Sequence, residues 1–111
     1  MKDKIWLIGT GYMAIEYIKV LRYLGKKVEV IGRGKHNAKK FLKLTGYSPY
    51  IGGLEKAINE SKPANNAIVS VTVDELYKCT KLLIENGCKR VLLEKPGSLK
   101  IDHYVPGTRI P

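Results

Sequence analysis

Short apolar runs alternate with amphipathic segments along most of the chain. Mostly apolar runs lie at residues 5–8, 28–31, 67–71 and 91–93, and glycine or polar residues bound each of them. Runs of this length are typical of strands that are buried on both faces of a sheet. We predict a strand at each of these positions and a short further strand, third in chain order, around residues 50–51.

Helices are expected between the strands, where apolar residues recur at the spacing of a helix face. The first expected helix ends at Gly25, a residue typical of the position just after a helix. Its apolar stripe consists of Ala14, Ile18, Leu21 and Leu24. A short helix at 37–44 would bury Phe41 and Leu44, and another is expected at 54–60.

The last expected helix follows the apolar run at 67–71. Thr72 and Glu75 match a capping box, in which each side chain would bind the backbone amide of the other residue. The apolar stripe that follows consists of Leu76, Cys79 and Leu83.

Strands and helices that alternate with short loops are typical of an α/β fold with a doubly wound parallel sheet, the Rossmann arrangement. Right-handed crossovers then predict the strand order 3-2-1-4-5. A length of 111 residues allows one compact domain. We expect this domain to span residues 1–100 and residues 101–111 to form a C-terminal tail.

The chain is basic, with 20 Lys and Arg against 10 Asp and Glu and a formal net charge of +10. The basic residues are spread along the chain, and no aromatic pattern typical of a single-strand binder accompanies them. We interpret most of them as solvated surface. This disfavours nucleic acid as a partner and leaves a nucleotide or another anionic ligand as their specific use.

Targeting and metal-binding signals are missing from the sequence. No apolar run approaches the length of a membrane-spanning helix, and residues 5–8 are too few for a secretory signal. Cys79 and Cys88 cannot by themselves form a disulfide framework or a tetrahedral zinc site. We expect a cytoplasmic protein with no membrane partner and no metal.

A phosphate-binding motif follows the first expected strand. Residues 9–14 match G-x-G-x-x-A, with Ala14 in the third small position. Gly11 has no Cβ, so a pyrophosphate could approach the backbone, and the first amides of the following helix would supply an anion site. The residues predicted here to bind a dinucleotide are Gly9, Thr10, Gly11, Tyr12 and Met13.

The end of the second strand bears on which dinucleotide is bound. NAD-binding sequences usually place Asp or Glu there for the ribose hydroxyls, but this chain has Gly32 and Arg33. The guanidinium of Arg33 could stack on adenine and pair with a 2′-phosphate, and Lys35 could add charge. We therefore favour NADP over NAD as the cofactor, although Arg33 could also be one more surface base.

A second motif, Glu94-Lys95-Pro96, ends the fifth expected strand. Together with the motif at 9–14 it resembles the glucose–fructose oxidoreductase/inositol dehydrogenase (Gfo/Idh/MocA-type) family, in its N-terminal nucleotide-binding domain. The segment 70–77 also resembles that family's fourth-strand loop, although Val73, Asp74 and Tyr77 stand where the family usually has Pro, Asn and His.

The resemblance implies roles for residues near the nicotinamide. Lys95 would be the catalytic residue, orienting the substrate or assisting proton transfer, and Glu94 would contact the nicotinamide ribose side. Val71 and Thr72, in the fourth-strand loop, would also bind the cofactor. The substrate class implied is a sugar, a polyol or a related carbinol.

Family members continue into a substrate domain, and we expect this chain to be without one. We therefore expect the cofactor domain of an oxidoreductase that is not catalytically competent alone. The alternative is a free-standing nucleotide-binding or sensing module without turnover. An uncovered fifth strand at the sheet edge would also favour self-association.

Overall fold

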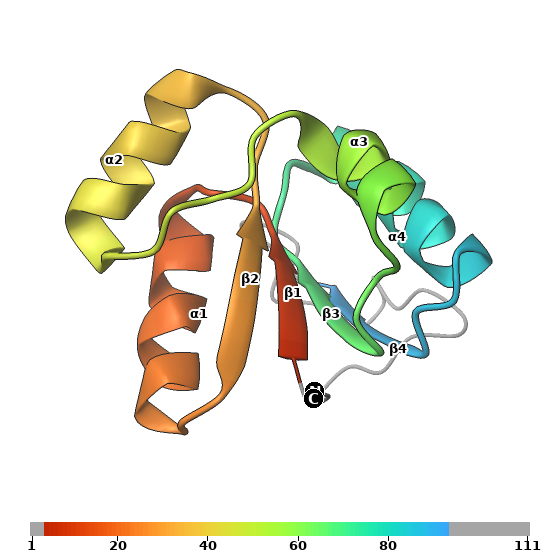
Figure 1. The fold of residues 1–111 in the computed structure, drawn as a ribbon, viewed down its shortest axis with the longest axis horizontal. Coiled ribbons are helices and arrows are strands. Elements are labelled where there is room, and N and C mark those ends of the chain that lie inside the picture. The colour runs from red at the N-terminus through yellow and green to blue at the C-terminus, as the bar shows by residue number, and fades with distance from the viewer. Residues whose placement is uncertain (1–3, 94–111) are drawn as a thin grey trace.

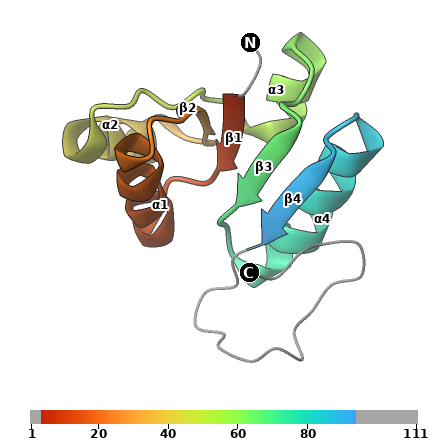
Figure 2. The same ribbon diagram turned by 90° about the horizontal axis from the view of Figure 1, so that it is seen from below.

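The computed structural model describes residues 4–93, which form a parallel sheet with helices on both faces. Within these residues the sheet has four strands in the order β2-β1-β3-β4, and Figure 2 shows β1, β3 and β4 side by side. The strands are β1 (Lys4–Ile8), β2 (Lys27–Ile31), β3 (Asn66–Val69) and β4 (Arg90–Leu93). The helices are α1 (Tyr12–Tyr23), α2 (Lys35–Thr45), α3 (Gly53–Glu60) and α4 (Val73–Glu85), as Figure 1 shows. The expected α/β fold with a parallel sheet is confirmed.

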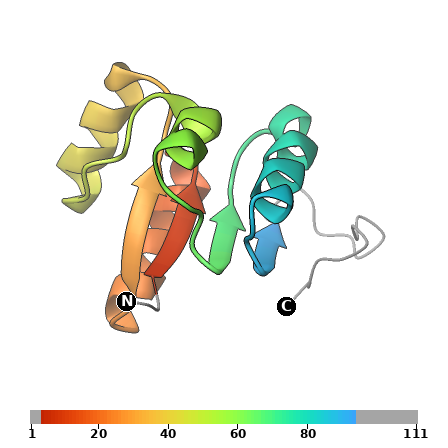
Figure 3. The same ribbon diagram turned by 45° about the vertical axis from the view of Figure 1, so that its right-hand side comes forward.

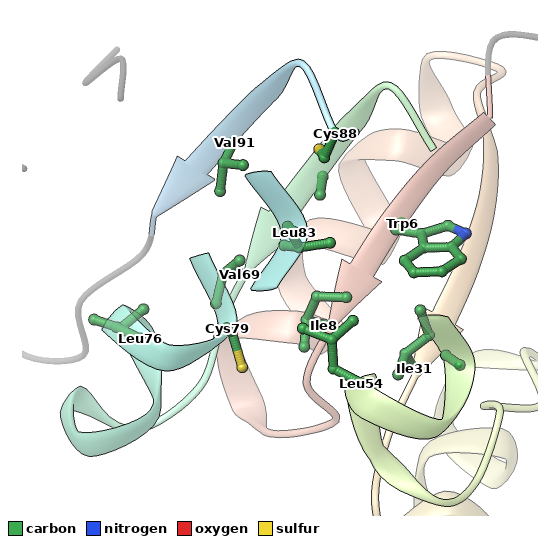
Figure 4. Close-up of a cluster of buried hydrophobic side chains, with 12 residues drawn as sticks. Trp6, Ile8, Ile31, Leu54, Val69, Leu76, Cys79, Leu83, Cys88 and Val91 are labelled. Atoms are coloured by element: carbon green, nitrogen blue, oxygen red, sulfur yellow. The ribbon is translucent and has the colours of Figure 1, made fainter. Parts of the chain in front are cut away.

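Each face of the sheet has its own core, because alternate residues of a strand point to opposite faces. Leu7 and Val30 belong to the core beneath α1 and α2, where Phe41 of α2 is buried. Trp6 and Ile8 belong to the core beneath α3 and α4, which Figure 4 shows. Figure 3 shows α1 behind the strands and α3 in front of them. The chain runs from β1 to β2 in one direction along the sheet and returns past β1 to β3 in the other. Right-handed crossovers in opposite directions place their helices on opposite faces of the sheet.

The expected third strand is reduced to one residue. Tyr50 forms an isolated parallel bridge with Ile31 on the outer side of β2, the position that the order 3-2-1-4-5 assigns to the third strand. The Tyr50 amide donates to the Val30 carbonyl at 2.7 Å, and the Gly32 amide donates to the Tyr50 carbonyl at 2.8 Å. Immediately afterwards Gly52 adopts a φ of +120°, which turns the chain into α3 before a ladder can extend.

The apolar residues predicted for the helix stripes are buried in the structure, except at the ends of α1 and α2. Ala14, Ile18 and Leu21 are buried as expected, but Leu24 is 57% exposed because α1 ends at Tyr23. Leu44 is also exposed.

Thr45 takes the buried place expected for Leu44 in the last turn of α2. Its hydroxyl donates to the carbonyl of Phe41 at 2.7 Å, which satisfies this polar group inside the core.

Two further expectations concern the surface. In the described part of the chain no helix is long and apolar enough to cross a membrane. Over residues 4–93, β4 pairs only with β3 and therefore ends the sheet. Self-association through this strand, the fifth strand of the sequence-based prediction, stays a prediction.

The core beneath α4 provides a stability test. Leu83 is fully buried, whereas its neighbour Ile84 is 48% exposed. Leu83→Ala is expected to lower the free energy of unfolding by about 2–5 kcal/mol, because it removes buried methyl groups and leaves a cavity. Ile84→Ala, the matched control, is expected to cost less than about 1 kcal/mol. Urea denaturation measures both, and equal losses would contradict the assignment of α4's buried face.

Candidate functional site

A cavity of about 870 Å³ lies where the carboxyl ends of β1, β2 and β3 meet. Ligands of doubly wound folds bind at this end of the sheet, where the strand order reverses. The described residues predicted to bind a cofactor all line this cavity: Gly9, Thr10, Gly11, Tyr12, Met13, Arg33, Val71 and Thr72. The fold therefore brings these separate segments to one place, and their contact with a cofactor stays a prediction.

Gly9 allows the ends of β1 and β3 to come together. Its amide donates to the Ile31 carbonyl at 2.9 Å, and its φ is +123°. A Cβ at this position would lie 2.0 Å from the backbone oxygen of Ser70, a distance that no side chain can accept. The close approach of the β1 and β3 backbones therefore requires glycine at position 9.

Gly11 has a different role, because nothing lies within 4 Å of the place where its Cβ would be. Its φ of −86° is one that any residue adopts, and it is the N-cap of α1. No side chain caps this helix and its first turn has no acidic residue. Gly11 thus leaves open space in front of backbone amides at a positive helix end, the arrangement that suits a phosphate.

Gly32 has a packing reason that the sequence does not reveal. A Cβ there would lie 2.8 Å from the methyl group of Thr10 and 3.7 Å from Pro49. Any side chain at this position would require the Thr10 side chain, in the loop of the phosphate-binding motif, to shift. The missing carboxylate at the end of β2 therefore follows from the close packing of two loops as well as from any cofactor preference.

Arg33 crosses the cavity toward α4. Its backbone carbonyl accepts a hydrogen bond from the Gly52 amide at 3.2 Å, and its Cγ lies 3.8 Å from the place of a Cβ on Gly53. Its Nη2 atom lies 3.4 Å from Oε1 of Glu75, and the Arg33 side chain is 69% exposed. Lys35, which was expected to add positive charge beside Arg33, is exposed and does not line the cavity. Asn37, two residues later, does line it.

The capping box expected at Thr72 and Glu75 is wrong in its side-chain bonds. Thr72 is the N-cap of α4 as expected, but no side chain caps this helix. The Glu75 amide instead bonds to the Thr72 carbonyl at 2.9 Å. The Glu75 carboxylate faces Arg33, an opposite charge that a local sequence pattern cannot place beside it.

Four residues of α4 line the cavity but were not predicted as site residues: Glu75, Lys78, Cys79 and Leu82. Their spacing puts them on one helix face, whereas the sequence assigned only Cys79 to a core stripe and Glu75 to a capping box. Burial raises the pKa of the Cys79 thiol to about 11, and the neighbouring Glu75 adds to this effect, while Arg33 and Lys78 oppose it. Cys79 is thus a neutral thiol at physiological pH and not a nucleophile.

Glu94 and Lys95 fall outside the residues that the structure describes, so their roles stay predictions. Between residues 4 and 93, no group of His, Cys, Asp and Glu side chains could hold a metal ion.

Comparison with known families settles the cofactor class. A profile described as "Oxidoreductase family, NAD-binding Rossmann fold" (GFO_IDH_MocA) matches residues 4–104. The chain belongs to this family. Its cofactor is therefore a nicotinamide dinucleotide, which fits the open space at Gly11 and the uncapped amides of α1.

Among solved structures, this GFO_IDH_MocA chain is similar to the D-arabinose dehydrogenase from Sulfolobus solfataricus. The TM-score is 0.57 and the sequence identity is 24%, over 98% of this chain and 37% of that one. This likeness shows the fold, and the chain spans little more than a third of the neighbour's length. No curated protein matches the sequence.

The two glycines of the phosphate-binding motif give opposite predictions. Gly11→Ala should keep the wild-type melting temperature but weaken dinucleotide binding at least about tenfold, because the new methyl group occupies the open space before the amides. Gly9→Ala should lower the melting temperature, since its methyl group collides with Ser70. Thermal melting and coenzyme titration measure the two effects. Wild-type affinity in Gly11→Ala would contradict a phosphate site at this position.

The raised pKa of Cys79 predicts slow alkylation. In the native protein iodoacetamide should label Cys79 far more slowly than in the urea-unfolded chain, because only the thiolate reacts. Labelling should accelerate as the pH rises from the ordinary thiol value of 9.0 toward about 11. Mass spectrometry of the labelled peptides measures the rate. Rapid native labelling at neutral pH would contradict the burial of this thiol.

Proposed function

We propose that this chain is the coenzyme domain of an oxidoreductase and that it binds NADP(H) in preference to NAD(H). The observation that carries the proposal is Arg33, whose guanidinium lines the cavity at the end of β2. Gly32, the residue before it, offers no carboxylate for a ribose, and a Cβ there would lie 2.8 Å from the Thr10 methyl group. A planar guanidinium suits a phosphate, with which it forms paired charge-assisted hydrogen bonds.

Different residues of this chain would bind different parts of the coenzyme. The amides after Gly11 would hold the pyrophosphate, and Arg33 would hold the adenosine 2′-phosphate. Val71 and Thr72 would lie on the nicotinamide side of the site together with Glu94. When bound, the nicotinamide supplies hydride transfer.

Lys95 is proposed as the catalytic residue, on the family resemblance of Glu94-Lys95-Pro96. Its ammonium would orient a carbinol or carbonyl oxygen of the substrate and exchange a proton with that oxygen. A sugar or polyol is the proposed substrate, supported by the fold shared with a D-arabinose dehydrogenase. We propose that turnover requires a substrate domain in addition to this coenzyme domain.

Coenzyme titration tests the proposal with an internal probe. Trp6 is the single tryptophan, and it packs in the same core as Ile8, Ile31 and Leu54, which line the cavity. Energy transfer from Trp6 to the reduced nicotinamide should therefore report binding. NADPH is expected to bind about tenfold more tightly than NADH, a difference of about 1.4 kcal/mol.

Arg33→Ala should remove this preference, weakening NADPH about tenfold and NADH less than about threefold, since only NADPH carries the 2′-phosphate. Lys39→Ala, which removes one exposed charge from α2 away from the cavity, is the matched control and should leave both affinities unchanged. Tighter binding of NADH by the wild type would contradict the preference. Failure to bind either coenzyme would contradict the proposed function.

A further inference from the structure

The ion pair between Arg33 and Glu75 joins two walls of the cavity. Arg33 follows β2, and Glu75 lies in the first turn of α4, which covers the far side of the site. Both residues line the cavity, and their closest atoms, Nη2 and Oε1, are 3.4 Å apart. The pair therefore lies where any ligand of the Arg33 guanidinium must bind.

Within residues 4–93, Arg33 is the ion-pair partner of the Glu75 carboxylate, and no helix cap uses this carboxylate. It does not form the capping box that its position after Thr72 suggests. Its side chain is 30% exposed, whereas that of Arg33 is 69% exposed, so the carboxylate is the better shielded member of the pair. A partly shielded charge acts more strongly on its neighbours than a fully solvated one.

The contact is also weak enough for a ligand to replace. It is a single contact at 3.4 Å with a largely exposed guanidinium, rather than a short bidentate pair. Pairs of this kind contribute little to stability. A phosphate dianion can offer the same guanidinium two charge-assisted hydrogen bonds.

We propose that Glu75 is a positioning residue that limits the preference for the 2′-phosphate by holding Arg33 in a competing ion pair. A 2′-phosphate must displace the carboxylate before it can pair with Arg33. A nucleotide without that phosphate leaves the ion pair intact. Glu75 thus lowers the affinity for NADP(H) and leaves the affinity for NAD(H) unchanged. This inference rests on the proposed role of Arg33.

The test uses adenosine nucleotides, so that it does not depend on the nicotinamide or on turnover. Adenosine 2′,5′-bisphosphate carries the 2′-phosphate, and 5′-AMP lacks it; calorimetry measures both affinities. Glu75→Gln is expected to bind the bisphosphate about fivefold more tightly than the wild type, with the affinity for 5′-AMP unchanged. A merely structural role for Glu75 would move both affinities together.

Asp74→Asn is the matched control. Asp74 lies beside Glu75 in the first turn of α4, but it is exposed and does not line the cavity. Both substitutions remove one negative charge from the same helix end, so any loss of helix stability should be similar. Only Glu75→Gln is expected to change the ratio of the two affinities.

A double-mutant cycle separates action through Arg33 from direct repulsion. In the Arg33→Ala background the gain from Glu75→Gln should fall below about twofold, since no guanidinium remains to be released. An equal gain in both backgrounds would overturn the positioning role. If the wild type binds the bisphosphate and Glu75→Gln binds it no more tightly, the inference fails while the proposed function stands. If neither nucleotide binds the wild type or the variant, the inference and the proposed function both fail.

Discussion

At the centre of the site, the ends of β1 and β3 approach so closely that no side chain can stand between them. A Cβ on Gly9 would lie 2.0 Å from the Ser70 carbonyl oxygen, and one on Gly32 would lie 2.8 Å from the Thr10 methyl group. Hydrogen bonds from the Gly9 amide to the Ile31 carbonyl and from the Ser70 amide to the Ile8 carbonyl hold the loops after three parallel strands against one another. Because the loops are packed at their bases, the cavity above them has a defined floor, and the amides of α1 open into it.

The same close packing has an electrostatic consequence. The end of β2 carries no carboxylate, and the charged side chains among the described residues that line the cavity are Arg33, Glu55 of α3, and Glu75 and Lys78 of α4. An opposite-charge pair across a ligand site does two things at once: it orders the cation, and it competes with any anion for it. In the function proposed here, selection between NADP(H) and NAD(H) therefore depends on α4 as well as on the end of β2.

Much of the fold could be predicted because its elements are determined locally. Continuous apolar runs marked the buried strands, and spacing of three and four residues marked the stripes of α1 and α4. The third strand was harder, because Tyr50 pairs through a single bridge that depends on β2 rather than on its own sequence. Leu24 and Leu44 were misplaced because a periodic stripe does not indicate where its helix ceases to touch the sheet.

The sequence by itself determined the order of elements, the phosphate-binding motif and the family, since each depends on neighbouring residues or on spacing along one chain. Tertiary structure alone decided that Gly32 makes room for Thr10, that Cys79 lies in the cavity wall, and that Glu75 faces Arg33 and not its own helix end. These facts join residues on different elements. Distances between such residues are set by packing across the sheet, which no local pattern encodes.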